Sequence, residues 1–212
     1  MASLLPSLVI ATVLVVGFWV ARRSNSSLRL KPPLETPTNL SLVSEKLVAA
    51  LPHSVLLPHD GEAFGKSINS YWAQQEREVV QECIVQPRDI AELAKAMAIL
   101  KQEYDERSTQ QWKKSDDVLF AVRGGGQSPV PGGASAKGGV LIDLTMFREV
   151  TVSDDRESVV LGAGARWVDV SRVLDEMDLI VVGGRSSDVG VAGYTLGGEH
   201  TLSASEFPID GF

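Results

Sequence analysis

The residues whose types and spacing favour chemistry lie in one stretch, where an apolar run gives way to five glycines within residues 121–133. Glycine accepts a positive φ and has no Cβ, so successive N–H groups around Gly124, Gly125 and Gly126 can point inward. Such an array forms a nest for an anion, typically a phosphate. We therefore interpret this stretch as an anion-binding loop.

Two common nucleotide-binding fingerprints do not fit this loop. A Rossmann fingerprint requires Gly-x-Gly-x-x-Gly, but Gly124-x-Gly126 is followed by Pro129 where the third glycine belongs. A Walker loop requires a lysine directly after its last glycine, and no lysine here is placed to supply it. Pro129 and Pro131 also prevent a helix from starting directly after the glycines. We therefore expect loop backbone, rather than a helix dipole, to hold the anion.

Composition and charge narrow the classes of partner. The chain is 44% hydrophobic and 22% charged, which is ordinary for a globular protein. A net charge of -7 argues against a nucleic-acid binder, because neutralising phosphates requires a basic face. Cys83 is the only cysteine, which excludes an internal disulfide framework and a cysteine zinc site. His53, His59 and His200 lack metal-ligand spacing, so we interpret them as exposed polar residues and expect no metal site.

The elements that must position the loop alternate between strand and helix. An apolar run over residues 79–85, ended by Pro87, predicts a strand. Asp89 is a good N-cap for a helix with one apolar face, which carries Ile90 among others and runs to about Tyr104. A second strand over 118–122 then leads into the glycine loop, so we predict a β-α-β unit with the loop after its second strand.

The remaining patterns complete an α+β fold. They predict a helix over 40–51, a loop over 56–72, strands over 140–144, 150–152, 158–161 and 179–182, and a helix with Trp167, Val170, Val173, Leu174 and Met177 on one face. At this spacing we interpret Trp167 and Met177 as packing residues.

The N-terminal segment, residues 1–23, contains eighteen uncharged and mostly apolar residues, 4–21, directly followed by Arg22-Arg23. At 1.5 Å per residue they nearly cross a hydrocarbon core of about 30 Å. The positive-inside rule favours an uncleaved membrane anchor with the remaining chain in the cytosol. A signal peptide, with the domain luminal or secreted, is the alternative. Residues 24–37, rich in Ser, Asn and Pro, predict a linker, which leaves 38–212 as the domain.

Several motifs, in order over about residues 71–198, carry a family resemblance. They are Tyr71-Trp72, Cys83-Ile84-Val85-Gln86-Pro87, Val122-Arg123-Gly124-Gly125-Gly126-Gln127-Ser128-Pro129, Gly139-Val140-Leu141-Ile142-Asp143-Leu144, Gly162-Ala163-Gly164-Ala165-Arg166-Trp167, Val189-Gly190-Val191-Ala192-Gly193 and Leu196-Gly197-Gly198. With these motifs the chain resembles the PCMH-type flavin-binding domain of the vanillyl-alcohol oxidase superfamily, and most of all the fungal berberine-bridge-enzyme-like oxidases.

The resemblance implies that FAD lies along the domain, with its pyrophosphate held by two backbone segments, 123–128 and 188–193. The FAD-binding residues that it implies are Arg123, Gly124, Gly125, Gly126, Gln127, Ser128, Gly190, Val191 and Gly193. Two side chains in these segments keep alternatives open. Arg123 pairs either with a pyrophosphate oxygen or with an acidic neighbour such as Asp143. Ser128 either donates to phosphate or begins the turn before Pro129.

Departures from the family pattern concern how FAD is attached. In bicovalent relatives a histidine follows the glycines and a cysteine precedes the Val-Gly motif, whereas this chain has Gln127 and Ser186. Neither residue can form the corresponding bond to the flavin, so the resemblance implies non-covalent FAD. Asp188, next to the Val-Gly motif, is best interpreted as a carboxylate that caps its loop, because a negative side chain beside pyrophosphate is unfavourable.

The resemblance also implies an FAD-linked oxidoreductase that oxidises a secondary metabolite with O2 as the acceptor. Relatives continue into a substrate domain and a catalytic base, which have no counterpart in these 212 residues. The catalytic residue and the substrate are therefore unassigned. Two hypotheses follow: a membrane-anchored oxidoreductase, or a truncated, non-catalytic flavin-binding remnant or partner subunit whose missing half comes from a second polypeptide.

Overall fold

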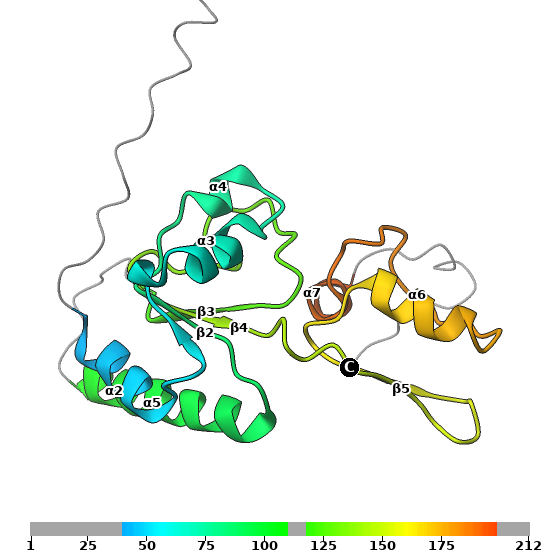
Figure 1. Cartoon of the computed structure of the whole chain (residues 1–212), viewed down its shortest axis with the longest axis horizontal. Helices are drawn as coiled ribbons and strands as arrows, with labels where there is room; N and C mark the ends of the chain where they lie inside the picture. Colours follow the sequence, from blue (N-terminus) through cyan, green and yellow to red (C-terminus); the bar gives the residue numbers. More distant parts are fainter. Residues whose placement is uncertain (1–39, 110–117, 199–212) are drawn as a thin grey trace, which may run out of the picture. The chain divides into compact units, whose positions relative to one another are not determined.

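The computed structural model describes residues 40–109 and 118–198 of the chain (Figure 1). The predicted anchor or signal segment 1–23, the linker 24–37 and His200 lie outside the described residues. Within 40–109 and 118–198, no helix has both the length and the apolar character needed to cross a bilayer.

A four-stranded mixed sheet organises the first part of the domain. Its strands are β1 (Val55–Leu56), β2 (Cys83–Val85), β3 (Phe120–Arg123) and β4 (Val140–Asp143). The order across the sheet is β1-β2-β4-β3; β4 is parallel to both of its neighbours, and β1 is antiparallel to β2. The predicted β-α-β unit is present as β2, a helix and β3, but β4 lies between its two strands. All four residues of β4 are buried, as expected of a strand covered on both faces.

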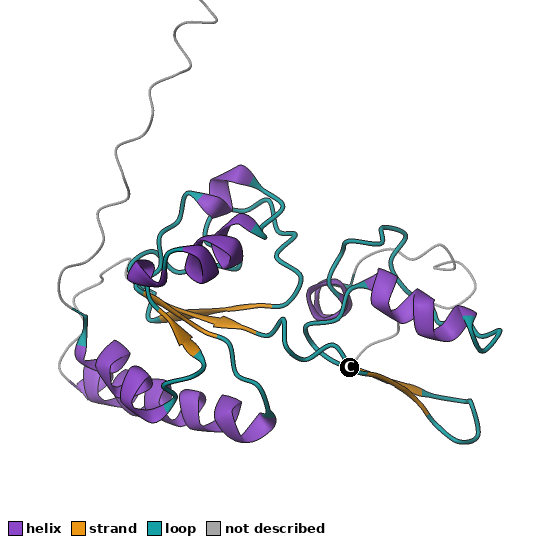
Figure 2. Ribbon diagram, in the orientation of Figure 1, coloured by secondary structure: helices purple, strands orange, loops and turns teal. Residues whose placement is uncertain are grey.

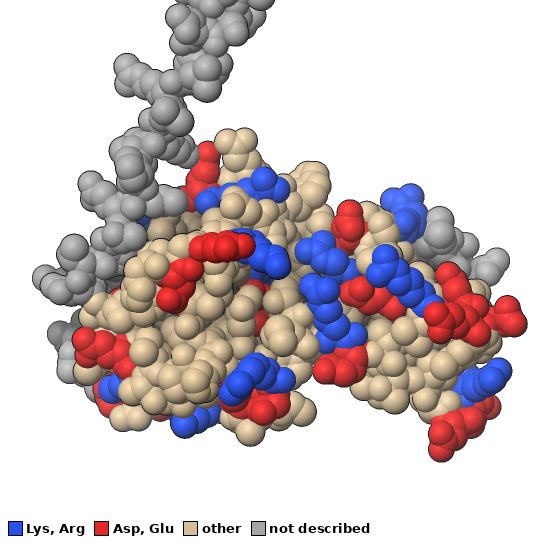
Figure 3. Space-filling model, in the orientation of Figure 1, with Lys and Arg blue, Asp and Glu red and all other residues tan. Residues whose placement is uncertain are grey.

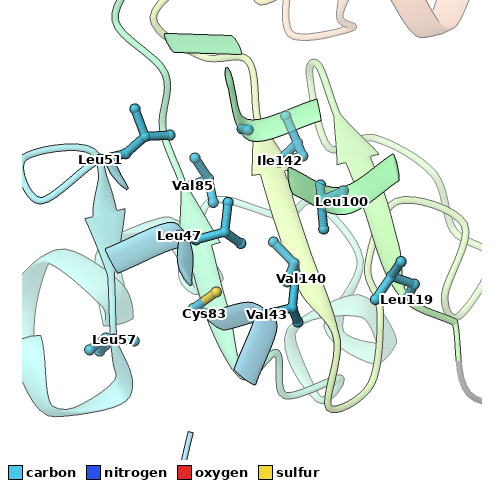
Figure 4. Packing of buried hydrophobic residues seen from close by; sticks show 11 residues of the cluster. Val43, Leu47, Leu51, Leu57, Cys83, Val85, Leu100, Leu119, Val140 and Ile142 are labelled. Atoms are coloured by element: carbon cyan, nitrogen blue, oxygen red, sulfur yellow. The ribbon is translucent and has the colours of Figure 1, made fainter. Parts of the chain in front are cut away.

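Helices cover both faces of this sheet (Figure 2). On one face lie α2 (Leu42–Ala50) and α5 (Ile90–Thr109); on the other lie the 3-10 helix η1 (Pro58–Asp60), α3 (Glu62–Asn69) and α4 (Gln74–Arg77). Alternation along the strands divides the core in two. Cys83 and Val85 pack with Leu47 and Leu100 beneath the sheet (Figure 4), whereas Ile84 packs in a separate cluster on the other face.

The second part of the domain contains a hairpin and two helices. They are β5 (Val150–Val152), β6 (Val159–Leu161), α6 (Trp167–Asp175) and α7 (Val191–Gly197). The two strands pair antiparallel, which confirms the predicted strands 150–152 and 158–161, whereas the preceding strand β4 belongs to the four-stranded sheet. A separate apolar cluster joins α6 to α7, and in it the Trp167 ring meets the Tyr194 ring edge-on, with centroids 5.3 Å apart. Trp167 is thus a packing residue, as predicted.

Charged side chains of both signs are intermixed over the face of the molecule drawn in Figure 3. Within α5, Lys101 pairs with Asp105 at the i, i+4 spacing that places two side chains on one side of a helix, and Arg88, which precedes the helix, pairs with Glu92 in its first turn. These pairs are exposed and contribute little to stability.

Several sequence predictions differ from the structure. The predicted loop 56–72 contains α3, whose only apolar side chains on its packed face are Phe64 and Ile68, too few to signal a helix. Residues 179–182 are not a strand, since they pair with no described strand, and Ile180 is 96% exposed. Met177 follows α6 and is exposed rather than packed.

The helix after Asp89 is also longer than predicted, because α5 continues past Tyr104 to Thr109. Its first residue, Ile90, is exposed rather than part of the packed face. The predicted cap is confirmed, since the Asp89 carboxylate accepts a hydrogen bond from the Glu92 N–H.

The packing of α2 leads to a testable prediction about the stability of the fold. Leu47 is fully buried in the core beneath the sheet, whereas Leu42 on the same helix is 61% exposed. We expect L47A to lower the free energy of unfolding by about 2 to 5 kcal/mol, and L42A by less than about 0.5 kcal/mol, because only the first leaves a cavity. Urea denaturation measures both, and equal losses would contradict the assignment of this face to the core.

Candidate functional site

A cavity of about 500 Å³ opens between the two glycine-rich segments of the chain. Its walls come from the loop after β3 and from the residues that enter α7, with one tryptophan from the segment before α4. The lining residues are Trp72, Val122, Gly124, Gly125, Gly126, Gln127, Ser128, Pro129, Gly133, Ala134, Val189, Gly190, Gly193 and Tyr194. The volume is within the usual range for a small-molecule site.

Direct backbone contact between two glycines forms the floor of this cavity. A Cβ added to Gly125 would lie 2.5 Å from Gly190 Cα, and one added to Gly190 would lie 2.4 Å from Gly125 N. Carbon atoms do not approach non-bonded atoms this closely. No residue other than glycine therefore fits at either position without displacing one of the segments. Absence of a side chain therefore allows two residues 65 positions apart in the sequence, Gly125 and Gly190, to meet.

Arg166 fastens the same two segments together. Its Nη1 donates to Asp188 O at 2.5 Å, and its Nη2 donates to Gly125 O at 2.8 Å. Gln127 adds a third link, because its Nε2 also donates to Asp188 O, at 3.1 Å. Sequence reasoning missed this role of Arg166, although the residue lies within the Gly162–Trp167 motif.

Backbone pairing supports this arrangement next to Arg166. Trp167 N donates to Val189 O, and Val191 N donates to Ala165 O, so the chain before α6 runs antiparallel to the chain before α7. The Val191 side chain is buried in the α6–α7 cluster, which places it away from the cavity.

The Arg123 side chain is buried beneath the loop and does not line the cavity. It is 1% exposed, and its Nη2 lies 2.5 Å from Asp143 Oδ2, so of the two partners left open by the sequence the structure shows the carboxylate. Its Nη1 donates to Ser67 O at 2.8 Å, and the guanidinium lies 4.4 Å from the centroid of the Tyr71 ring. The ion pair thus joins β3 to β4 and to α3 directly before the first glycine of the loop.

Asp143 keeps its charge despite burial. Burial by itself would raise the pKa of this carboxyl, but the Arg123 charge and hydrogen bonds from Arg123, Gln86 and Thr145 outweigh burial and hold the pKa below its ordinary value. For the Tyr71 hydroxyl, burial dominates and raises the pKa. It donates to Ala134 O at 2.6 Å and therefore remains a neutral donor beside the cavity wall.

Glu76 holds the part of the wall that contains Gly133 and Ala134. This carboxylate is fully buried and accepts hydrogen bonds from the Gly133 and Ala134 N–H groups and from the Ser135 hydroxyl. The sequence did not identify Glu76 because it lies in a short, highly polar helix that resembles a surface segment. Its function is to order the loop 130–135.

No ionised side chain lines the cavity, and the glycine loop in its wall carries N–H groups that have no partner among the described residues. Within 40–109 and 118–198, the N–H groups of residues 124–128 donate no hydrogen bond to another residue. No lining residue is a Lys, Arg, Asp, Glu or His. Ser128 Oγ accepts from Val130 N at 3.2 Å, which is the turn-forming alternative for that hydroxyl. Unpaired N–H groups in a loop without ionised side chains are the groups with which a backbone nest binds an anion.

Other sequence-predicted residues lie apart from this cavity. Ser186 is exposed and does not line it, and Asp188 joins the site through its backbone carbonyl. Cys83 is buried in the core beneath the sheet, where burial raises the pKa of its thiol to about 11. His53 and His59 are exposed, and the described residues contain no cluster of three or more potential metal ligands.

Comparison with known proteins identifies relatives of this chain. The model of the "FAD binding domain" family matches residues 81–207. The chain is 36% identical over 154 residues to the FAD-dependent monooxygenase prx3 of Penicillium roqueforti, covering 72% of this chain and 27% of that protein. It is 34% identical over 137 residues to the FAD-dependent monooxygenase tpcD of Cochliobolus heterostrophus, covering 64% and 24%. The chain therefore spans about a quarter of the length of these relatives.

Solved structures share the fold at lower identity. Physcomitrella patens BBE-like 1 superposes with a TM-score of 0.57 at 22% identity, covering 72% of this chain and 30% of that one. Phl p 4, a grass pollen allergen with glucose dehydrogenase activity, gives a TM-score of 0.63 at 14% identity, covering 77% and 33%. These likenesses support a mixed α/β fold of the PCMH type.

Removing the carboxylate of the buried ion pair tests its structural role. We expect D143N to lower the free energy of unfolding by about 3 to 5 kcal/mol, because it leaves the Arg123 charge buried without a partner. Asp105 is a matched control, since it pairs with Lys101 at the same 2.5 Å distance but on the exposed surface of α5. D105N should have a much smaller effect. Chemical denaturation of both variants measures the difference, and equal effects would contradict a special role for the buried pair.

Lowering the pH should remove the stability that the ionised Asp143 carboxylate contributes to the fold. The folded pKa of Asp143 lies below the unfolded value, so its stabilisation is complete above about pH 4 and is lost as the pH falls through the folded pKa. The difference in unfolding free energy between the wild type and D143N should therefore narrow as the pH falls below about 4. Denaturation series from pH 7 to acid measure it, and a difference that stays constant would show that Asp143 is not the titrating group.

Proposed function

This chain belongs to the FAD binding domain family, with a PCMH-type fold, and on that premise we propose that it binds FAD in the cavity between its two glycine segments. The single observation that carries the proposal is the contact of Gly125 with Gly190, which brings a nest of unused N–H groups against the second segment. The pyrophosphate of FAD is the anion that this nest accepts.

The residues present fit a pyrophosphate. Its negative charge needs several donors and no nearby carboxylate, and the lining contains backbone N–H groups of residues 124–128 and no ionised side chain. The buried ion pair beneath the loop keeps Arg123 engaged with Asp143, so binding relies on backbone dipoles. The pyrophosphate-binding groups in this proposal are Gly124, Gly125, Gly126, Gln127, Ser128, Gly190 and Gly193.

We propose that FAD is held without a covalent bond. The Gln127 amide cannot form the linkage that histidine forms, and its Nε2 already donates to Asp188 O. Ser186 has no thiol, and the only cysteine of the chain, Cys83, is buried in a different cluster. Neither described histidine, His53 or His59, lines the cavity.

We propose that the protein to which this domain belongs is an oxidoreductase of secondary metabolism with O2 as its acceptor. The relatives prx3 and tpcD are FAD-dependent monooxygenases, which supports flavin redox chemistry. When bound, FAD supplies the hydride acceptor, whereas the residues of this chain bind the cofactor, orient it and exclude water from its phosphates.

A second candidate function, that of a flavin-binding subunit, is supported by the residue types in the cavity wall. No lining residue is a carboxylate or a histidine, so the described residues supply neither of these common general bases beside the cavity. In this alternative the chain is a flavin-binding subunit, and a second polypeptide supplies the substrate pocket and the base. Anchoring through residues 4–21, followed by Arg22-Arg23, would place either form at a membrane.

Titration of the purified full chain with FAD tests the binding proposal. We expect flavin absorbance to stay with the protein on gel filtration, added FAD to raise the Tm, and acid precipitation to release all of the flavin into solution. An unchanged Tm together with colourless protein would overturn the binding proposal. A yellow acid pellet would overturn only its non-covalent part.

A pair of glycine variants links binding to the contact between the segments. G125A should weaken FAD binding by about tenfold or more, because its Cβ would displace one segment from the other and misplace the backbone donors, and loss of one hydrogen bond to a charged oxygen costs about 1.5 kcal/mol. G65A is the matched control, since a Cβ on Gly65 in α3 meets nothing within 4 Å. Isothermal titration calorimetry measures both, and equal affinities would contradict the assigned site.

A further inference from the structure

Trp72 is a large aromatic side chain left exposed on the wall of the cavity. It is 62% exposed, whereas the other described tryptophan, Trp167, is 6% exposed and packed in a core. Exposed apolar area has a free-energy cost in water that internal packing of Trp72 does not recover. The Trp72 ring therefore leaves aromatic surface uncovered beside the cavity.

The backbone that carries this ring is firmly held. Trp72 N donates to Gly126 O at 3.0 Å, which ties the residue to the glycine loop itself. Arg77 Nε donates to Tyr71 O at 2.6 Å, and Arg77 Nη2 donates to Trp72 O at 3.4 Å. Gln75 Nε2 donates to Pro129 O at 2.6 Å, a second link between this segment and the loop. The ring thus projects from a backbone that is positioned together with the anion nest.

Other lining residues do not offer a comparable aromatic surface. Tyr194 is 5% exposed, and its ring is engaged with Trp167 in the α6–α7 cluster. The remaining walls are glycine, proline, valine, alanine, serine and glutamine. A dinucleotide carries a flat heteroaromatic ring at each end of its pyrophosphate, and the face of such a ring is best covered by an aromatic side chain.

We propose that Trp72 is the stacking surface for one of the two ring systems of FAD, and that it determines preference for a ligand with such a ring over pyrophosphate alone. The inference rests on the proposed FAD site and adds a residue to it. The π face of the Trp72 ring supplies contact area that backbone donors cannot supply. Trp72 therefore raises the affinity for FAD by stacking on a ring, while residues 124–128 hold the phosphates. The two rings are distinguished by ligands that carry only one of them.

The inference is tested by measuring the affinity of the full chain for FAD. The wild type is compared with W72A, W72F and a control variant. W72A should bind FAD about tenfold more weakly than the wild type, and W72F should recover most of that loss, because phenylalanine keeps a ring face. Y104A is the control, since Tyr104 is an exposed aromatic residue of α5 that does not line the cavity. Thermal melts check that the variants remain folded.

Fluorescence provides a readout that a structural role would not change. FAD should quench a part of the tryptophan emission of the wild type that is missing in W72F. In the same titrations, weaker ADP binding by W72A assigns the contact to adenine, and weaker FMN binding assigns it to isoalloxazine; either result supports the proposal. Equal affinities of W72A and the wild type for FAD, ADP and FMN would overturn it. Absence of FAD binding by the wild type would instead overturn the proposed function.

Discussion

The rest of the structure depends on the buried ion pair between Arg123 and Asp143. These residues stand at corresponding ends of β3 and β4, and the same guanidinium reaches Ser67 on α3 and lies over the Tyr71 ring. Because a buried charge without a partner is very costly, β3, β4, α3 and the segment with Tyr71 must pack in an arrangement that satisfies both charges. The glycine loop begins at Gly124, directly after Arg123, so the ion pair fixes the position at which the loop starts.

From that starting point, short-range contacts shape the cavity. Buried Glu76 orders the loop 130–135 through two N–H groups and a hydroxyl, and Arg166 clasps carbonyl oxygens of both glycine segments. These charged groups bind protein rather than face the cavity, which leaves the lining neutral and its N–H groups available. A site of this kind selects its ligand through the direction of backbone dipoles, which favours an anion over a neutral or cationic group.

Sequence patterns predicted much of this correctly where the signal is local. The β2–α5–β3 succession, the Asp89 cap and the β5–β6 hairpin each follow from periodicity or turn chemistry within a few residues. The wrong predictions have a common cause. Residues 179–182 have the composition of a strand, but a strand needs a neighbour to pair with, and α3 forms on two apolar contacts that only the sheet provides.

The sequence by itself predicted that a glycine-rich loop binds an anion, and it determined that this loop fits neither common nucleotide fingerprint and that an ordered series of motifs marks a flavin-binding family. These properties reside in residue type and spacing. Only the tertiary structure decided that Gly125 touches Gly190, that Arg123 pairs with Asp143 instead of facing the cavity, and that Glu76, Arg166 and Trp72 belong to the site. Each of those facts joins residues distant in the chain, and the physical reason is that long-range contacts are selected by packing and charge satisfaction over the whole fold, which no local pattern contains.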